Sequence, residues 1–142
     1  MKRRLFAILA LVLIISSFML TTVASSVVPR YNNTAGTTTN FVISNTGKAS
    51  ISAVYNAYPS YFSKATITSY IEKRTLGLFW TKVDIGQPNN EWVDTSTDIA
   101  KAFLHEFQLN STGTYRATVV YEISGSGGAT DVIDYEQERT YS

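Results

Sequence analysis

The chain of 142 residues has no cysteine, one histidine and three prolines, and these scarcities exclude several kinds of protein. Without cysteine there is no disulfide framework and no thiol nucleophile. Zinc needs three or four His, Cys or acidic ligands, so a single histidine argues against a zinc site. That histidine, His105, is followed by Glu106, but adjacent residues of a strand point to opposite faces. We therefore expect His105 to be structural, and we expect no cofactor.

Basic side chains are also few, with 12 Lys and Arg against 11 Asp and Glu. Beyond the first four residues, Lys73-Arg74 is the only adjacent basic pair. A nucleic-acid partner requires a basic face for its phosphates. No such face is visible, so nucleic acid is not predicted as a partner.

The N-terminus has the order of a secretory signal. Lys2, Arg3 and Arg4 precede an unbroken apolar run from Leu5 to Ile15, and the small residue Ala24 ends a stretch suited to cleavage. We predict a signal peptide at 1–24, with cleavage after Ala24 or at one of the next two serines, and a secreted protein. The alternative is an uncleaved membrane anchor, because a span of about 20 residues is just long enough to cross a bilayer. Removing the three basic residues would leave a net charge of −2, nine basic against eleven acidic.

The remaining chain has the length of one domain. Residues 25–39 are rich in Thr and Asn without an apolar period, so we interpret them as a flexible leader. The folded domain is predicted at 40–142, where alternating segments with frequent turn signals are typical of an all-β protein. The predicted strands are 41–43, 48–55, 64–74, 78–83, 91–94, 101–109, 115–123 and 130–141.

Leu109, Gly113 and Tyr115 have the spacing of a tyrosine corner, in which a tyrosine at the start of a strand bonds back to the preceding turn. This motif predicts a single immunoglobulin-like antiparallel β-sandwich of seven to eight strands. Such sandwiches keep a core tryptophan after a hairpin, which makes Trp80 the expected core residue. The segment 96–108 is ambiguous, because Ile99, Phe103 and Phe107 suit one face of a helix or one side of a strand. The corner requires a strand into Leu109, so we predict a strand from about Lys101, with a short helical turn near 98–100 left open.

The chain resembles a group of small secreted immunoglobulin-like proteins of Gram-positive bacteria, most of them uncharacterised. The resemblance rests on Ile71-Glu72-Lys73 ahead of Trp80, then on Trp92, then on Gly113-Thr114-Tyr115-Arg116. It implies an exported β-sandwich without disulfides, and it carries over no catalytic residue. Antibody domains have a cysteine two residues after the corner tyrosine, where this chain has Ala117.

Three aromatic residues are the candidates for a binding surface. Tyr58 and Tyr61 lie in the loop 56–62, where they form a stacking platform for sugars or proteins or else close one end of the sandwich. Trp92 lies between Glu91 and Asp94, so we expect one face of its ring near water. The predicted partner is an unknown protein or glycan at the cell surface, and a membrane partner only through an uncleaved signal segment.

The carboxylates of the last strand are the remaining candidates for a catalytic or metal site. Asp134, Glu136 and Glu138 share one face of the last strand, but a glycosidase needs two carboxyls across a cleft. Asp131 near the glycine-rich loop 124–128 could join Asp134 and Glu136 in binding calcium, although the spacing of a calcium-binding hand is missing. We therefore predict a non-catalytic secreted binding or structural module. The alternatives are a small secreted hydrolase that uses these carboxylates, or an exported antibacterial, toxin-like protein.

Overall fold

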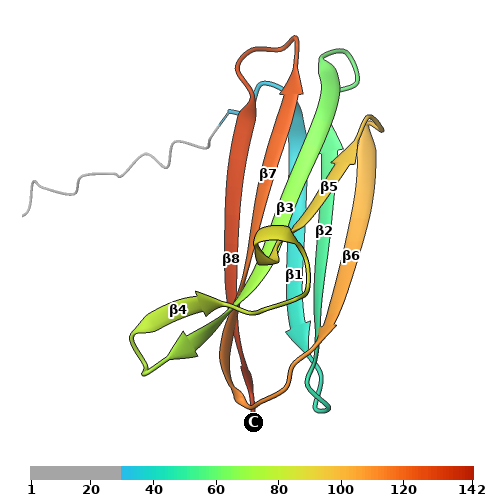
Figure 1. Cartoon of the computed structure of the whole chain (residues 1–142). Coiled ribbons are helices and arrows are strands. Elements are labelled where there is room, and N and C mark those ends of the chain that lie inside the picture. Colours follow the sequence, from blue (N-terminus) through green and yellow to red (C-terminus); the bar gives the residue numbers. More distant parts are fainter. Residues whose placement is uncertain (1–29) are drawn as a thin grey trace, which may run out of the picture.

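The computed structural model describes residues 30–142, which form two antiparallel sheets packed against each other (Figure 1). The first sheet has the order β1-β2-β6, and the second has the order β4-β3-β7-β8 with β5 also paired to β3. The strands are β1 (Thr34–Ile43), β2 (Lys48–Ala57), β3 (Phe62–Thr75), β4 (Phe79–Lys82), β5 (Trp92–Ser96), β6 (Ala100–Gln108), β7 (Gly113–Gly125) and β8 (Asp131–Tyr141). The predicted all-β sandwich is confirmed, with eight strands. The predicted signal peptide and its cleavage after Ala24 lie outside the described residues.

The core lies between the sheets and follows the period of two that the sequence predicts. On β7 the inward residues from Tyr115 to Ile123 are all buried, and β2 and β3 show the same alternation. Two buried tyrosines keep their hydroxyl groups bonded at the core's edge: Tyr55 donates to the carbonyl of Asp98 at 2.6 Å, and Tyr121 donates to that of Thr38 at 3.0 Å. The core therefore gains large rings without leaving buried phenols unpaired.

The tyrosine corner has the geometry that its spacing predicts. The Tyr115 ring is buried, and its hydroxyl donates to the carbonyl oxygen of Ser111 at 2.6 Å. Leu109 is buried beside it. Gly113 has φ +145°, a conformation that residues with a Cβ rarely adopt. This bend joins β6 in one sheet to β7 in the other.

The predicted flexible leader is wrong for residues 34–39, which belong to β1. The edge strand β1 pairs with β2, with Thr37 opposite Tyr55 and Thr39 opposite Ala53. A threonine-rich stretch can form a strand because β-branched side chains favour strands, even where one face meets water. No apolar period marks residues 34–39, because the less exposed positions of this segment, Thr34, Thr37 and Thr39, are all polar.

The prediction of Trp80 as the core tryptophan is also wrong. Register pairs Trp80 with Arg74 and Lys82 with Glu72, and all four face outward because Ile71 faces the core. The half-buried indole instead lies under the guanidinium of Arg116, whose Cζ is 4.6 Å from the ring centroid. This pairing fixes Trp80 on the outer surface of the second sheet.

The ambiguous segment 96–108 is extended. β6 pairs with β2 over its whole length, with Phe103 opposite Ala53 and Phe107 opposite Ala49, so the predicted strand is confirmed. A bend, and not the helical turn that was left open, occupies Asp98 and Ile99. The only helical turn between residues 30 and 142 is η1 (Pro88–Asn90), and none there is long and apolar enough to cross a membrane.

Candidate functional site

A groove lies at the end of the sandwich that carries the β2–β3 turn and the β7–β8 loop. Figure 1 shows this end opposite the C-terminus. The groove encloses about 970 Å³ and is bordered by the start of β1, the β2–β3 turn and the β7–β8 loop. We call it the tyrosine groove. Its lining consists of Arg30, Tyr31, Asn32, Thr34, Ala35, Gly36, Tyr58, Tyr61, Ser126 and Gly127.

Three tyrosines give the groove its exposed aromatic surface. Tyr31, Tyr58 and Tyr61 are 37%, 42% and 49% exposed, so each keeps a large part of its ring in contact with water. The turn that holds the last two is closed by hydrogen bonds from the amides of Tyr61 and Phe62 to the carbonyl of Tyr58, both 3.0 Å. Phe62 packs against the core, with its ring centroid 5.9 Å from that of Tyr55. Phe62 therefore covers the end of the core, which leaves the two tyrosines free to face the groove.

The β7–β8 loop at the border of the groove is held by Asn33, which is fully buried. Its side-chain oxygen accepts the amide of Gly127 at 3.1 Å, and its side-chain nitrogen donates to the carbonyl of Ala129 at 3.0 Å. The glycines of this loop are needed for close packing. A Cβ on Gly125 would lie 1.9 Å from the carbonyl oxygen of Tyr61, and one on Gly127 would lie 2.3 Å from that of Asn32. The β7–β8 loop is thus closely packed against the start of β1 and the β2–β3 turn, and the three segments together border the groove.

Asp131 fixes the start of β1 to the start of β8, and we call its contacts the Asp131 clamp. One carboxylate oxygen accepts the amides of Asn33 and Thr34 at 2.7 and 2.9 Å and the Thr34 hydroxyl at 2.8 Å, and the other accepts the amide of Asn32 at 2.8 Å. Burial alone would raise the pKa of Asp131, but these donors outweigh it and hold the pKa below its ordinary value. Sequence reasoning considered Asp131 only as a calcium ligand, whereas its carboxylate accepts hydrogen bonds from three backbone amides and one hydroxyl.

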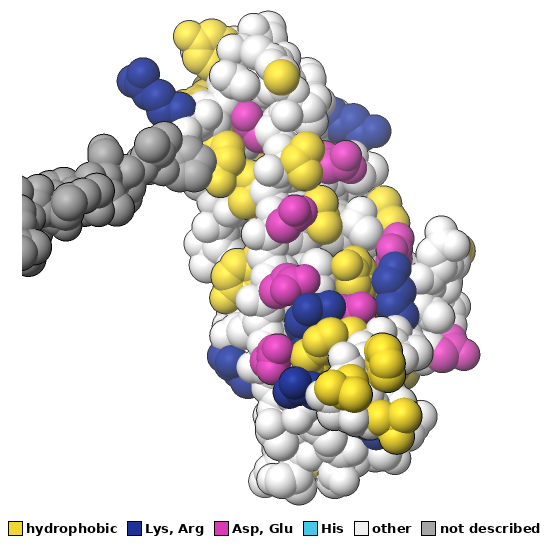
Figure 2. All heavy atoms as spheres, turned by 90° about the vertical axis from the view of Figure 1, so that its left-hand side faces the viewer, with side chains coloured by type: hydrophobic (Ala, Val, Ile, Leu, Met, Phe, Trp, Pro, Cys, Tyr) yellow, Lys and Arg dark blue, Asp and Glu magenta, His cyan; other side chains and the backbone are white. Residues whose placement is uncertain are grey.

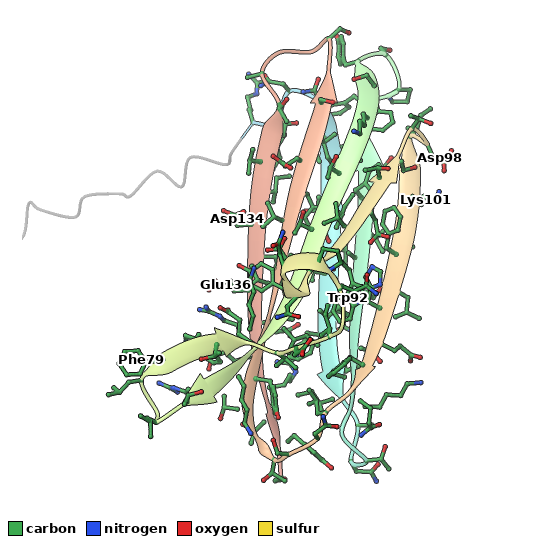
Figure 3. The ribbon with its side chains drawn as sticks, in the orientation of Figure 1. Phe79, Trp92, Asp98, Lys101, Asp134 and Glu136 are labelled. Carbon is green, nitrogen blue, oxygen red and sulfur yellow. The ribbon has the colours of Figure 1, made fainter. Side chains whose placement is uncertain are left out.

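No protein-family model, curated protein or solved structure matches this chain. The groove is lined by aromatic rings, one guanidinium, one amide side chain and short hydroxyl-bearing residues, and its lining contains no carboxylate. A second hollow at the same end, beside the ion pair of Asp98 and Lys101 (Figure 3), encloses about 390 Å³ and has no aromatic residue in its lining.

Trp92, the third candidate from the sequence, lies away from the groove, on the long side of the sandwich (Figure 3). Its ring is half-buried and stacks on His105, with centroids 4.9 Å apart and planes 4° from parallel. The same imidazole has Nε2 2.6 Å from Oδ2 of Asp94. Trp92 and Asp94 come from β5 and His105 from β6, so these three residues close the edge between the two sheets.

The pair of Asp94 and His105 is the one acid–histidine contact in the described part of the chain. Sequence reasoning asked only whether Glu106 could orient the histidine and missed Asp94, eleven residues away on another strand. In a catalytic triad the imidazole also bonds to a nucleophilic hydroxyl. Among residues 30–142, the hydrogen bond of this ring goes to Asp94 and to no serine or threonine. The arrangement suits a structural contact.

The carboxylates proposed for a hydrolase lie elsewhere. Asp134, Glu136 and Glu138 are exposed on one face of β8, outside the tyrosine groove. Figure 3 shows the first two along this strand. Glu136 forms an ion pair with Arg116, which is shared with Glu72 on β3. Between residues 30 and 142, no group of three or more acidic or histidine side chains is placed to hold a metal ion. The structure therefore brings these carboxylates onto an open surface and not into a cleft.

Proposed function

We propose that this chain is an exported, non-catalytic binding module whose ligand site is the tyrosine groove. The observation that carries the proposal is the gathering of Tyr31, Tyr58 and Tyr61, half-exposed, on a rim fixed by Asn33 and the Asp131 clamp. A tyrosine offers a large amphipathic contact area at a low cost in conformational entropy. A preformed rim lowers the ordering cost of binding further. Export is supported by the N-terminal order of three basic residues, an apolar run and Ala24.

We further propose that the sandwich is immunoglobulin-like. Two features support this: the strand order β1-β2-β6 in one sheet with β3-β7-β8 in the other, and the tyrosine corner at Tyr115. In variable immunoglobulin domains the loops between the second and third strands and between the last two strands lie at one end and bind antigen. The corresponding connections here, β2–β3 and β7–β8, both border the tyrosine groove.

The ligand class that fits best is a segment of another protein. The groove lining combines tyrosine with asparagine, serine and glycine, which is the residue mixture of antibody paratopes. Its volume of about 970 Å³ is at the upper end of pockets for small ligands, so it accommodates a protruding loop. A glycan is the second ligand class, and the same experiment distinguishes it.

The test compares the purified protein with a variant in which Tyr31, Tyr58 and Tyr61 are all replaced by alanine. Binding is measured by surface capture of envelope and culture-medium proteins, and in parallel on a glycan array. Leu104→Ala is the matched control, because Leu104 is exposed on β6 and does not line the groove. Each buried tyrosine at an interface centre contributes about 1–2 kcal/mol, so the triple variant should bind at least a hundredfold more weakly.

The proposal predicts a protein ligand that is lost with the triple variant and kept with Leu104→Ala. A glycan ligand with the same dependence would keep the site and change the ligand class. Binding that survives the triple substitution would place the site elsewhere and overturn the proposal.

A further inference from the structure

The hairpin between β3 and β4 ends in an apolar tip made of Leu76, Leu78 and Phe79. These side chains are 85%, 77% and 62% exposed. Figure 1 shows the hairpin projecting sideways from the body of the sandwich, and Figure 2 shows apolar side chains gathered where it faces the viewer. Phe79 is on the side that would face a core, but no strand of the other sheet lies opposite it. Such a concentration of exposed large apolar side chains on a soluble surface indicates an interaction site.

The tip is held in one conformation. Leu78 donates its amide to the carbonyl of Thr75 at 3.2 Å, and Arg74 Nε donates to the carbonyl of Gly77 at 3.0 Å. Leu76 and Gly77 have φ of +53° and +69°, the positive values that the tightest hairpin turns require. Asparagine or glycine would adopt this conformation with less strain than leucine does. Keeping a leucine in this strained place indicates that its exposed side chain has a role.

The charge around the tip has a single sign. Residues 73–83 contain Lys73, Arg74 and Lys82 and no acidic residue. Lys82 is paired with Glu91. Lys73 bonds to the hydroxyl of Ser111 and Arg74 to a backbone carbonyl, so neither of these two cations has a carboxylate partner within residues 30–142. The hairpin therefore presents apolar side chains at its end and, in the residues just before them, two basic side chains without a carboxylate partner among the described residues.

We propose that this hairpin docks the protein on an anionic lipid surface. Arg74 is one residue before the end of β3 and Leu76 begins the turn, so at about 3.4 Å per residue their Cα atoms lie within about 7 Å of each other. Apolar side chains of interfacial proteins are buried about 5–10 Å deep, at the boundary of headgroups and acyl chains. With the tip at this depth, Lys73 and Arg74 meet the negatively charged headgroups. A convex tip with apolar side chains on both faces suits a fluid bilayer. The proposal is independent of the tyrosine groove, which lies at the end of the sandwich.

The test uses the absence of cysteine from the chain. A single cysteine in Leu78→Cys carries an environment-sensitive dye, and Ser60→Cys, exposed in the β2–β3 turn, carries the same dye as the matched control site. Each labelled protein is mixed with vesicles of phosphatidylcholine alone or with 30% phosphatidylglycerol, some containing a nitroxide-labelled lipid as quencher. Because the dye reports from residue 78 itself, insertion of the N-terminal apolar run does not imitate the signal.

We expect the dye at residue 78 to shift to the blue and to be quenched on anionic vesicles, with the dye at residue 60 unchanged. Binding measured by the shift should be at least tenfold weaker on neutral vesicles, and at least tenfold weaker again when Leu76 and Phe79 are both replaced by glutamine. Lys73→Gln with Arg74→Gln should remove the preference for anionic lipid and leave the fold unchanged by circular dichroism.

Three outcomes would overturn the proposal. In the first, the dye at residue 78 remains in a water-like environment on anionic vesicles. In the second, it shifts equally in the variant with glutamine at residues 76 and 79, so that the dye itself, and not the apolar tip, causes the signal. In the third, it shifts without vesicles as the protein concentration rises, which would assign the apolar tip to a second copy of the chain.

Discussion

Replacing Asp131 by asparagine tests the Asp131 clamp while keeping the size of the side chain. The carboxylate accepts four hydrogen bonds from Asn32, Asn33 and Thr34, two of them from buried amides. In Asp131→Asn, the side-chain oxygen can replace the carboxylate oxygen that accepts three of these bonds. The side-chain NH₂ group then faces the amide of Asn32, and the fourth bond is lost because both groups are donors. Hydrogen bonds to charged groups contribute about 1.5–3 kcal/mol. We therefore expect Asp131→Asn to lower the free energy of unfolding by about 2 kcal/mol at pH 7.

Alanine at the same position removes the acceptor for every donor. Two buried amides then lack a partner, each at about 1–3 kcal/mol, so the loss should reach about 3–5 kcal/mol. This is a large fraction of the 5–15 kcal/mol that is typical of a domain. Asp134→Asn is the matched control: Asp134 is on the same strand, exposed and free of such contacts, and should change stability by less than about 0.5 kcal/mol.

The effect of Asp131→Asn on stability should depend on pH. The pKa of Asp131 is lower in the folded protein than its ordinary value of 3.8, so the unfolded chain binds the proton more tightly. Its contribution is complete above pH 3.8 and is lost as the pH falls through the lower folded-state pKa. The difference in stability between the wild type and Asp131→Asn should therefore shrink in acid, below about pH 4.

The assay is urea unfolding followed by circular dichroism at pH 7 and at a series of values down to pH 2.5, with native-state hydrogen exchange at Asn33 and Thr34. A difference of less than about 0.5 kcal/mol between Asp131→Asn and the wild type at pH 7 would contradict a stabilising role of the Asp131 carboxylate. So would a difference of full size that is unchanged at the lowest pH.

Three further substitutions test other contacts. Tyr115→Phe removes the hydrogen bond to Ser111 and should cost about 1–2 kcal/mol in urea unfolding, and an unchanged midpoint would count against the tyrosine corner. Gly125→Ala places a Cβ 1.9 Å from the carbonyl of Tyr61 and should cost more than about 2 kcal/mol in the same assay, whereas a neutral result would show that the loop is not closely fitted. His105→Gln keeps a polar side chain but loses the stacking on Trp92, and we expect a loss of about 1 kcal/mol with a changed Trp92 fluorescence. An unaltered emission spectrum would argue against that stack.

Short-range patterns in the sequence were enough to predict most strands. The alternation from Tyr115 to Ile123, the turn at Gly113 and the strand into Leu109 each depend on neighbouring residues, and the structure has these elements where the pattern places them. The face of Trp80 was not predictable by analogy with a core tryptophan. The register of β4 against β3 decides which face Trp80 occupies, because the residue opposite it is the outward-facing Arg74.

Contacts between distant segments could not be predicted in the same way. Asp131 lies almost one hundred residues from Asn33, and nothing near either residue indicates that the carboxylate meets those amides. The strand at 34–39 was missed for the same reason, because its order depends on β2 and on the Asp131 clamp and not on an apolar period. Tyr58 and Tyr61 were predicted as candidates from the sequence, but Tyr31 joins them only through the fold.

We propose the tyrosine groove as the surface by which this protein binds its ligand. The most direct measurement places a photo-cross-linking amino acid at Tyr58, or at Leu104 as control, in cells that produce the full chain. After illumination, we expect a cross-linked partner protein from position 58 and none from position 104. Equal cross-linking from both positions, or none from position 58 while the partner is still bound, would contradict it.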